Sequence, residues 1–541
     1  MDRRFFLRLS LFAAASALVG WRPSPARAAS SRVPGEYDAV IVGAGLGGLT
    51  CAAYMARNGY RPLVLEKQGT VGGYAGSFTR SAGGAEFTCE ISLHASALTT
   101  PDSTRMLEDV GVRDKIDIVP HPHAWVSRFP DFTVEVPART GLDGFERQLA
   151  GMFPAERQGL ADYFGLWRGV MAELAKLDKG LSREERAEFP RLFPNLWAIR
   201  DKTVGQLIDA RLRDPRARAV LAQSSGYYGL PPSRLAAFYY LAPTADYLTY
   251  GGDYIKGTSQ SLSDALADAV RAGGGEVVLD TAAVGILVEN GRAVGVRADD
   301  GRDYRGRAVA VNSAAPDLLA GLLPQGALPE KQRRRMAGLS PSPSSFIVWL
   351  GLDRDITRDF RFAEMSCFPG TDLDASWQTA MDCDLGRSGF SLMVYDNLIR
   401  GYSPPGHTSL SIMSLTGYDH WKPFEAAYHA GDKKAYDREK ARLTALLVER
   451  AERLVLPGLS KMIVMQDSST PLTNVRFTGN TAGALYGYNQ TPDNSFMTRL
   501  PNRTGVPGLY LCSAWGDPGG GYGGVMLGGK KAFREMVEDW G

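Results

Sequence analysis

Apolar runs separated by glycine turns form the clearest pattern in the chain, at residues 37–67. A strand-length apolar run, YDAVIV, is followed by glycines, an alanine-rich stretch with helical spacing, and a second apolar run. Short apolar runs bounded by turn residues predict buried strands, and the longer periodic stretch between them predicts a helix. We therefore expect a strand, a helix and a parallel strand of one sheet.

A second patterned block spans residues 251–316. It predicts a helix around Leu262–Val270, a glycine turn at Gly273–Gly275, and alternating strands broken at Asn290–Gly291 and Asp300–Gly301. Both dipeptides are hairpin signals because Asn, Asp and Gly tolerate positive φ. We expect this block to add a parallel strand and an antiparallel meander to the first sheet. An independent all-β module is the alternative, but about 60 residues would give it only a marginal core.

The rest of the chain has a different pattern, with amphipathic helices before residue 250 and an apolar strand, SFIVWLGLD, after residue 344. The helical region is interrupted at Pro154, and a further helix is predicted in EKARLTALLVERAERLV. Two domains whose segments alternate along the chain account for this order of helices and strands. The predicted fold is α/β, with a Rossmann-like nucleotide-binding domain formed by 36–110, 250–335 and 500–541, interleaved with an α+β substrate domain formed by 111–249 and 336–499.

Composition narrows the function only slightly. The hydrophobic fraction of 44%, the charged fraction of 22% and the net charge of +2 are ordinary for a globular protein and give no basis for binding nucleic acid. The five cysteines form no C-x-x-C pair and predict neither a disulfide framework nor a metal site. The chain has no G-x-S-x-G or H-E-x-x-H motif, which disfavours a hydrolase.

The first 28 residues predict an export signal. Arg3 and Arg4 precede an apolar run too short to cross a bilayer, and Ala26 and Ala28 form a small-residue cleavage site. The RRFFLR string resembles a bacterial twin-arginine signal, which implies periplasmic or exported localisation. An uncleaved N-terminal anchor is the alternative.

The first glycine turn predicts a dinucleotide site. Its G-x-G-x-x-G pattern is formed by Gly43, Gly45 and Gly48, with Gly47 inside it. These glycines allow a tight turn, close approach of a pyrophosphate, and packing of the helix on the strand, while the helix N-terminus faces the phosphates. Glu66 ends the second strand, where a carboxylate can accept hydrogen bonds from ribose hydroxyls and disfavours a 2′-phosphate.

A second glycine turn distinguishes FAD from NAD. Gly72 and Gly73 follow Glu66 and Lys67, and this resembles the extended flavin motif, in which a glycine turn comes after the adenosine site. Extended FAD places its ring far from the first turn and needs a second backbone cradle. The stretch WGDPGGGYGGVMLGG at 515–529 is the candidate, although glycine-rich composition alone is typical of a linker.

Aromatic residues gather between the two patterned blocks. They line either a long apolar pocket or an ordinary core, and a face that docks on a membrane surface is a further possibility. The residues are Tyr227, Tyr228, Phe238, Tyr239, Tyr240, Tyr247 and Tyr250.

The order of motifs resembles the flavoprotein family that includes bacterial phytoene desaturases, carotenoid isomerases and retinol saturase, within the wider amine-oxidase-like superfamily. The resemblance rests on the glycine motifs above together with FPAERQGLADYF, YYGLPPS, GGDYIKGTSQSLSDALA, VNSAAP, TPLTNVRFTGNTAGALYGY and GVPGLYLCSAWGDPGGGYGGVMLGGKKA. It implies an FAD-binding domain of glutathione-reductase type and a hydrophobic small-molecule substrate. It also implies that the C-terminal glycine segment contacts the flavin and begins the last helix.

The residues that this resemblance assigns to the second cradle are Gly519, Gly520, Gly521, Gly523, Gly524 and Val525, where the last helix is expected to begin. Asp517 is expected to bond a ribityl hydroxyl, with an exposed loop acid as the alternative. The chain departs from the family near the ring, where EFTCEISLHAS has Thr88 and Glu90 in place of the usual Asp and Gly. Glu90 and His94 are therefore candidates for proton transfer, with structural roles as the alternative.

Three functions fit these motifs. The first is an FAD-dependent oxidoreductase that desaturates, saturates or isomerises carbon–carbon double bonds of a long isoprenoid such as a carotenoid or retinoid. The second is an exported amine oxidase, for which Tyr486 and Tyr488 could supply an aromatic cage. The third is a non-catalytic lipid-binding protein that retains FAD.

Overall fold

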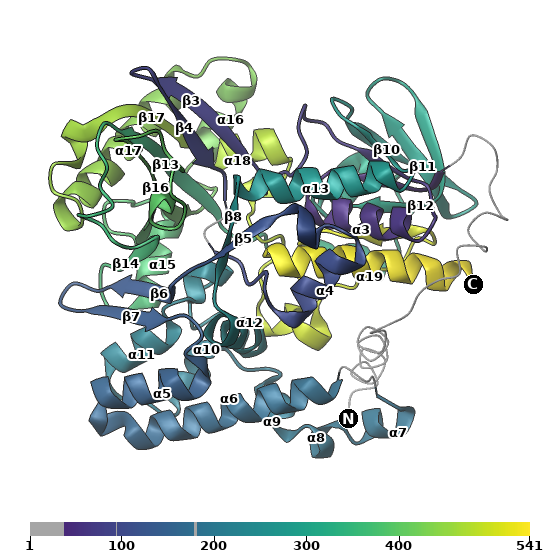
Figure 1. Ribbon diagram of the computed structural model, residues 1–541. Coiled ribbons are helices and arrows are strands. Elements are labelled where there is room, and N and C mark those ends of the chain that lie inside the picture. The colour runs from purple at the N-terminus through teal and green to yellow at the C-terminus, as the bar shows by residue number, and fades with distance from the viewer. Residues whose placement is uncertain (1–36, 93–94, 178–180) are drawn as a thin grey trace.

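The computed structural model describes residues 37–92, 95–177 and 181–541, so the predicted signal at 1–28 lies outside the described residues. Two seven-stranded sheets organise this part of the chain (Figure 1). Within it, no helix is both long enough and apolar enough to cross a bilayer.

The first sheet is parallel at its centre, as the sequence predicts. Its five parallel strands are, in order, β18 (Leu509–Leu511), β12 (Asp303–Val311), β1 (Tyr37–Val42), β2 (Pro62–Leu65) and β9 (Glu276–Val278). An antiparallel meander of β11 (Arg292–Ala298) and β10 (Ala283–Glu289) extends from β12. The predicted hairpin turns are confirmed, because Asn290, Gly291 and Gly301 all have positive φ.

Two helices from distant parts of the chain pack against α3 (Leu46–Arg57) beside this sheet. They are α13 (Thr258–Ala272) and α19 (Tyr522–Trp540) (Figure 1). Because it is enclosed by helices and sheet, α3 is buried from Leu46 to Ala56, which explains its alanine-rich sequence.

The second sheet is mixed and supports the other half of the molecule. Its strands are, in order, β17 (Ile463–Ser469), β13 (Ser344–Leu352), β16 (Thr408–Thr416), β15 (Phe390–Met393), β14 (Glu364–Cys367), β6 (His123–Arg128) and β7 (Thr133–Pro137). Every residue of β13 is buried, which accounts for its continuous apolar sequence. The two smaller ribbons are β3 (Ser77–Ala82) with β4 (Ala85–Glu90), and β5 (Asp117–Pro120) with β8 (Asp253–Lys256).

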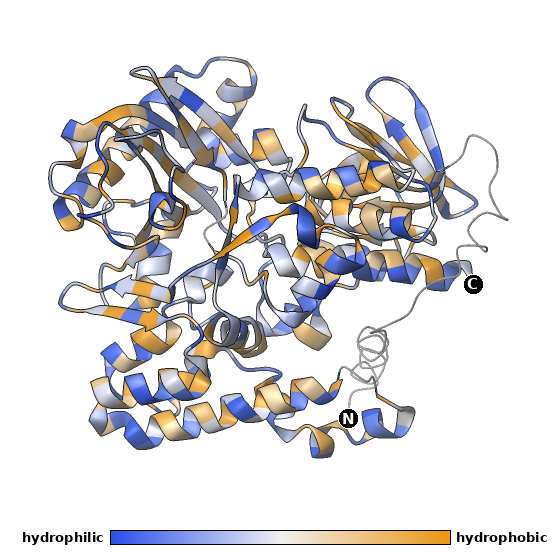
Figure 2. Cartoon of the chain, in the orientation of Figure 1, coloured by the Kyte–Doolittle hydropathy of each residue, from blue (hydrophilic) through white to orange (hydrophobic). Residues whose placement is uncertain are grey.

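Helices complete both halves. The structure has helices α4 (Pro101–Asp109), α5 (Gly141–Met152), α6 (Arg157–Leu177), α7 (Arg183–Ala187), α8 (Phe189–Leu192), α9 (Pro194–Ile199), α10 (Val204–Asp209), α11 (Pro215–Ala222), α12 (Ala237–Tyr250), α14 (Glu330–Ala337), α15 (Leu373–Met381), α16 (Lys422–His429), α17 (Lys434–Leu454) and α18 (Pro471–Thr478). Figure 2 shows hydrophobic and hydrophilic residues alternating along α5 and α6. Their apolar residues enter a core around Phe164 and Trp167.

The first sheet takes its strands from segments between 37 and 65, 276 and 311, and 509 and 511. The second takes them from segments between 123 and 137, 344 and 416, and 463 and 469. The boundaries of the two interleaved domains stay a prediction.

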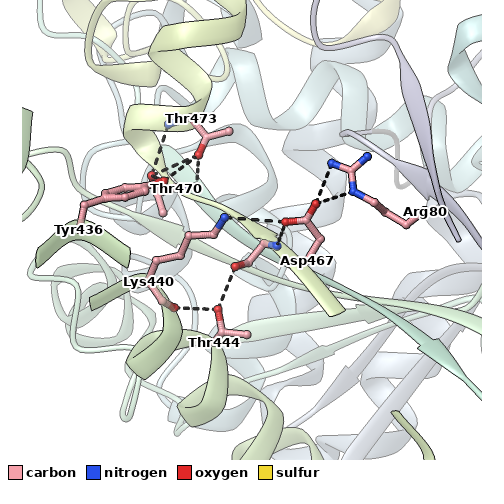
Figure 3. A network of polar contacts seen from close by, with 8 residues as sticks. Arg80, Tyr436, Lys440, Thr444, Asp467, Thr470 and Thr473 are labelled. Carbon is pink, nitrogen blue, oxygen red and sulfur yellow. Dashed lines mark hydrogen bonds and ion pairs between the residues drawn. The ribbon is translucent and has the colours of Figure 1, made fainter. Parts of the chain in front are cut away.

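A polar network ties the β3–β4 hairpin to the second sheet (Figure 3). Arg80 of β3 donates to the carboxylate of Asp467 of β17 through Nε and pairs with it through Nη2, both at 2.9 Å. Lys440 of α17 lies 3.8 Å from the other carboxylate oxygen. One carboxylate therefore serves two cations from different elements, and this arrangement is worth more than an isolated surface pair.

We expect Asp467→Asn to loosen this hairpin. Losing the network should cost about 1 kcal/mol locally, so the amides of β3 and β4 should exchange with solvent about fivefold faster. Hydrogen exchange read by mass spectrometry measures this. Asp419→Asn, which removes an isolated and highly exposed pair with Lys422, is the control and should change nothing there. Unchanged exchange of these amides in the Asp467 variant would show that the network does not hold the β3–β4 hairpin on the second sheet.

Candidate cofactor and substrate site

One cavity of about 760 Å³ brings the two ends of the chain together. It runs from the glycine turns at the N-terminal ends of α3 and α19 to a wall formed by α12 and β13. Most residues of both predicted cradles lie along it. A cavity of this size fits a large ligand.

The first cradle is the start of α3. Gly45 is the N-cap and has no side-chain oxygen, so no side chain caps the helix. The first hydrogen bond of the helix runs from the Leu49 N–H to the Gly45 carbonyl oxygen (2.9 Å), which leaves the N–H groups of the first turn without a partner in the helix. Gly43, Gly45 and Gly47 line the cavity there, and the φ of +95° at Gly43 requires glycine.

Gly48 does not line the cavity. A Cβ at this position would lie 2.3 Å from the carbonyl oxygen of Gly43, so glycine is needed to close the helix against the strand end. This is the packing role expected of the third glycine in the motif.

The second glycine turn lies against the first. The Gly72 N–H donates to the Ala44 carbonyl oxygen (2.8 Å), and both Gly72 and Gly73 adopt positive φ and line the cavity. Lys67 also lines the cavity, and its Nζ donates to the carbonyl oxygen of Arg476 (3.3 Å).

Glu66 lies where the sequence predicts, directly after β2 and in the cavity wall. Its carboxylate accepts hydrogen bonds from the Ala44 N–H (2.7 Å) and the Gln68 N–H (2.9 Å). Burial raises the pKa of Glu66, while these two N–H groups lower it. A carboxylate offers about four acceptor positions, so two remain for ribose hydroxyls.

The second cradle is the start of α19. The helix begins at Tyr522, three residues before the predicted Val525, because Gly521 forms the N-cap with φ +82° and ψ 153°, a conformation almost restricted to glycine. No side chain caps this helix either, and its first bond runs from Val525 N–H to Gly521 O (2.9 Å). The cavity is lined here by Gly520, Gly521, Gly523, Gly524 and Val525.

Two residues predicted for this cradle lie elsewhere. Gly519 is absent from the cavity wall, and a Cβ there would lie 1.9 Å from the Gln490 amide nitrogen. Asp517 also does not line the cavity, because its carboxylate turns away and pairs with Lys531 of α19 (2.7 Å). This corrects the predicted bond from Asp517 to a ribityl hydroxyl.

Two buried side chains hold the loop before α19, and sequence reasoning missed both. Arg499 donates to the carbonyl oxygens of Tyr488 (3.0 Å), Ala514 (2.6 Å) and Gly516 (2.9 Å). Asn502 donates to the Asp517 carbonyl oxygen and accepts from the Asp517 N–H, both at 2.9 Å. Burial lowers the pKa of Arg499 to about 10, so it stays charged at neutral pH and fixes the loop.

The two residues predicted for proton transfer do not form a pair at the cavity. Glu90 is buried, does not line the cavity, and accepts hydrogen bonds from the Tyr254 hydroxyl (2.9 Å) and the Ser259 N–H (3.0 Å). It therefore joins β4 to α13 and β8, which corrects the catalytic assignment. His94 lies outside the described residues.

The predicted aromatic pocket is formed in part. Tyr227, Tyr228, Phe238, Tyr239 and Tyr247 line the cavity. Tyr240 instead belongs to the core of the helical layer, and Tyr250 is not part of the cavity wall. Tyr486 lines the cavity but Tyr488 does not, so these two tyrosines do not form a cage. Ile347, Met413 and Leu485 add aliphatic surface.

Charged residues in the cavity wall are few. Among the lining residues that the structure describes, Lys67 is the only basic one, and the acids are Glu66, Asp102, Asp246 and Asp317. Burial, together with the nearby Asp102 carboxylate, raises the pKa of Asp246 to about 6. Burial likewise raises the pKa of Asp317 to about 6, opposed by Lys67.

These residues fit FAD. Two uncapped helix N-termini present N–H groups and positive dipole ends to one cavity, as a pyrophosphate requires, and Glu66 lies beside the first of them. Open space above Gly521, where an added Cβ would meet no atom within 4 Å, leaves room for a large group. The fold and the site together define a dinucleotide-binding flavoprotein.

The comparisons with known proteins agree. A family described as flavin containing amine oxidoreductase matches residues 46–537, and the chain belongs to this family. The chain is 24% identical to prolycopene isomerase of Daucus carota (94% of this chain, 81% of the relative) and 23% identical to all-trans-retinol 13,14-reductase of Macaca fascicularis (89% and 82%). A putrescine oxidase structure with bound putrescine shares the fold, with a TM-score of 0.58 at 15% identity over 93% of this chain and 98% of that one. The protein is an FAD-dependent oxidoreductase.

We expect Gly521→Ala to lower FAD occupancy severalfold, because a Cβ strains the backbone at the helix start and enters the cavity. The ratio of flavin to protein absorbance in purified protein measures this. Gly406→Ala is the control, since Gly406 also has positive φ and open space around it but does not line the cavity. Full FAD occupancy in the Gly521 variant would rule out this cradle.

We expect Asp517→Asn to keep FAD within about twofold of the wild-type affinity. Its carboxylate faces Lys531 and not the cavity, so the variant loses one partly exposed ion pair. Titration of the apo-protein with FAD, followed by flavin fluorescence, measures the affinity. A tenfold or greater loss of FAD affinity would instead support a direct contact between Asp517 and the ribityl chain.

Proposed function

We propose that the protein acts on carbon–carbon double bonds of a long hydrophobic isoprenoid, such as a carotenoid or retinoid, by desaturation, saturation or cis–trans isomerisation. The observation that carries this proposal is the wall of the cavity beyond α19. Tyrosine rings and the aliphatic side chains of Ile347, Met413 and Leu485 line it, and basic residues are absent from it in the described part of the chain. Such a wall favours a neutral, apolar substrate.

The names of the relatives support the same substrate class. One relative is a prolycopene isomerase and another is an all-trans-retinol 13,14-reductase. Both align with most of this chain, so the similarity includes the segments that form the cavity as well as the glycine motifs.

The chain itself holds and shields the reactants. The amides at the starts of α3 and α19 would bind the pyrophosphate, and Glu66 would bind ribose hydroxyls. FAD supplies the two-electron chemistry when bound. The aromatic wall excludes water from the reacting double bond and keeps an extended substrate in line. We give Glu90 no part in proton transfer, because it does not line the cavity and its hydrogen bonds join it to β8 and α13.

A second candidate is oxidation of an amine, which two acidic side chains favour. Asp102 and Asp246 line the cavity, and neither has a hydrogen-bond partner in the described residues. An ionised carboxylate near a ring of tyrosines would attract an ammonium group. The shared fold with putrescine oxidase is compatible with this function.

Product analysis separates the two candidates. The FAD-loaded protein is incubated with carotenoid and retinoid polyenes, and separately with amines, under air and without it. We expect polyenes to change in isomer composition or saturation, as resolved by chromatography with absorbance detection, and amines to give no peroxide. Peroxide release with amines and unchanged polyenes would reject the proposal.

The pH dependence gives a further distinction. Because the pKa of Asp246 is about 6, its carboxylate is mostly neutral below that pH and charged above it. An amine substrate should therefore bind more tightly as the pH rises through 6, and Asp246→Asn should remove this rise. We expect polyene binding to lack the rise in both proteins, as fluorescence titration from pH 5 to 8 can measure. If polyene affinity rose with pH in the wild type and Asp246→Asn abolished that rise, this expectation would be wrong.

A further inference from the structure

We propose that the hydroxyl of Tyr486 binds an oxygen atom of the substrate, and so selects an isoprenoid alcohol or aldehyde over the corresponding hydrocarbon. This inference rests on the proposed function, since it names the substrate class more closely. It starts from the hydrogen bonds of the tyrosines that line the cavity.

Five of the other tyrosine hydroxyls in the described wall form hydrogen bonds with protein groups. Three of them donate to a backbone carbonyl oxygen or share a bond with a hydroxyl: Tyr74 with Gly483 (2.9 Å), Tyr239 with Gly520 (3.2 Å) and Tyr228 with the Thr244 hydroxyl (2.9 Å). The hydroxyls of Tyr227 and Tyr247 both donate to the carbonyl oxygen of Ala95. The hydroxyl of Tyr522 has no hydrogen-bond partner in the described residues, but protein atoms enclose it, so a ligand in the cavity does not reach it. These tyrosines present mainly ring surface to a ligand.

Tyr486 differs from all six, because its hydroxyl is both without a partner and open to the cavity. It lines the cavity, and its hydroxyl has no hydrogen-bond partner anywhere in the described residues. The oxygen is not closed off by protein atoms either, so a ligand in the cavity can reach it. Burial raises the pKa of Tyr486, which keeps the hydroxyl protonated and able to donate. A polar group in an apolar cavity without a partner is costly unless a ligand supplies one.

The chain fixes the ring with three glycines. A Cβ on Gly520 would lie 2.9 Å from Cα and Cβ of Tyr486, and a Cβ on Gly229 would lie 3.0 Å from its ring. Gly487, with φ +71°, turns the backbone tightly against Ala514. The Tyr486 N–H donates to the Ser342 hydroxyl (2.9 Å). The ring is thus held next to the C-terminal glycine loop, at the boundary between the cofactor cradle and the apolar wall.

A fixed donor at this boundary favours a substrate oxygen. A long apolar chain along the wall can place a terminal hydroxyl or carbonyl oxygen there. A site built to hydrogen-bond such an oxygen discriminates against the analogue that lacks it. One neutral hydrogen bond of this kind corresponds to about a tenfold difference in affinity.

The test compares two ligands and three proteins. The ligands are all-trans-retinol and the hydrocarbon in which a methyl group replaces its CH₂OH group. The proteins are FAD-loaded wild type, Tyr486→Phe, and Tyr488→Phe as the control. Tyr488 comes from the same segment but does not line the cavity, and its hydroxyl bonds to the Met336 carbonyl oxygen. Affinities come from quenching of tryptophan fluorescence, and FAD content is measured for each protein.

We expect wild type and Tyr488→Phe to bind retinol about tenfold more tightly than the hydrocarbon. Tyr486→Phe should bind both alike, through loss of retinol affinity with hydrocarbon affinity unchanged. Equal binding of both ligands by wild type, or a preference that survives in Tyr486→Phe, would overturn the inference and leave the proposed function standing. Loss of FAD from Tyr486→Phe with the preference intact would also overturn it, by assigning the hydroxyl to the cofactor. Binding of neither polyene would reject the proposed function itself.

Discussion

The contact between α3 and α19 is the constraint on which the site depends. A Cβ on Gly529 of α19 would lie 2.2 Å from the Gly47 carbonyl oxygen of α3. Beside this contact, a Cβ on Gly47 would lie 1.9 Å from the carbonyl oxygen of Cys512, which follows β18. Only glycine allows backbone to approach backbone this closely. The contact brings helix starts from residues 46 and 522 to one cavity, and because neither helix is capped by a side chain, both leave N–H groups for a ligand.

The loop before α19 is fixed by the hydrogen bonds of two side chains that do not line the cavity. The charged guanidinium of Arg499 donates hydrogen bonds to three backbone carbonyl oxygens, and the side chain of Asn502 bonds to both the N–H and the carbonyl oxygen of Asp517. A glycine-rich segment has high conformational freedom when unfolded, so its fixed form depends on such bonds. The same loop supports Tyr486, which links the geometry of the cofactor cradle to that of the substrate wall.

The first glycine motif, Glu66 and the parallel sheet could be predicted because local sequence determines them: a strand, a tight turn and a helix are adjacent in the chain. The roles of Asp517 and Glu90 could not be predicted, since each depends on a partner that only the folded chain brings near. These partners are Lys531 of α19 for Asp517 and Ser259 of α13 for Glu90. The start of α19 was predicted three residues late because the conformation of Gly521 is not encoded in composition. Arg499 and Asn502 have no local motif at all.

Hydrogen exchange of the two helix starts, with and without FAD, tests most directly whether they form one cofactor site. The amides of residues 46–48 and 522–524 lack partners within their helices and should exchange quickly in the apo-protein. The account predicts that adding FAD slows exchange at both segments together and with the same dependence on FAD concentration. Protection of the first segment alone would contradict it, because the C-terminal glycines would then belong to something other than the cofactor site.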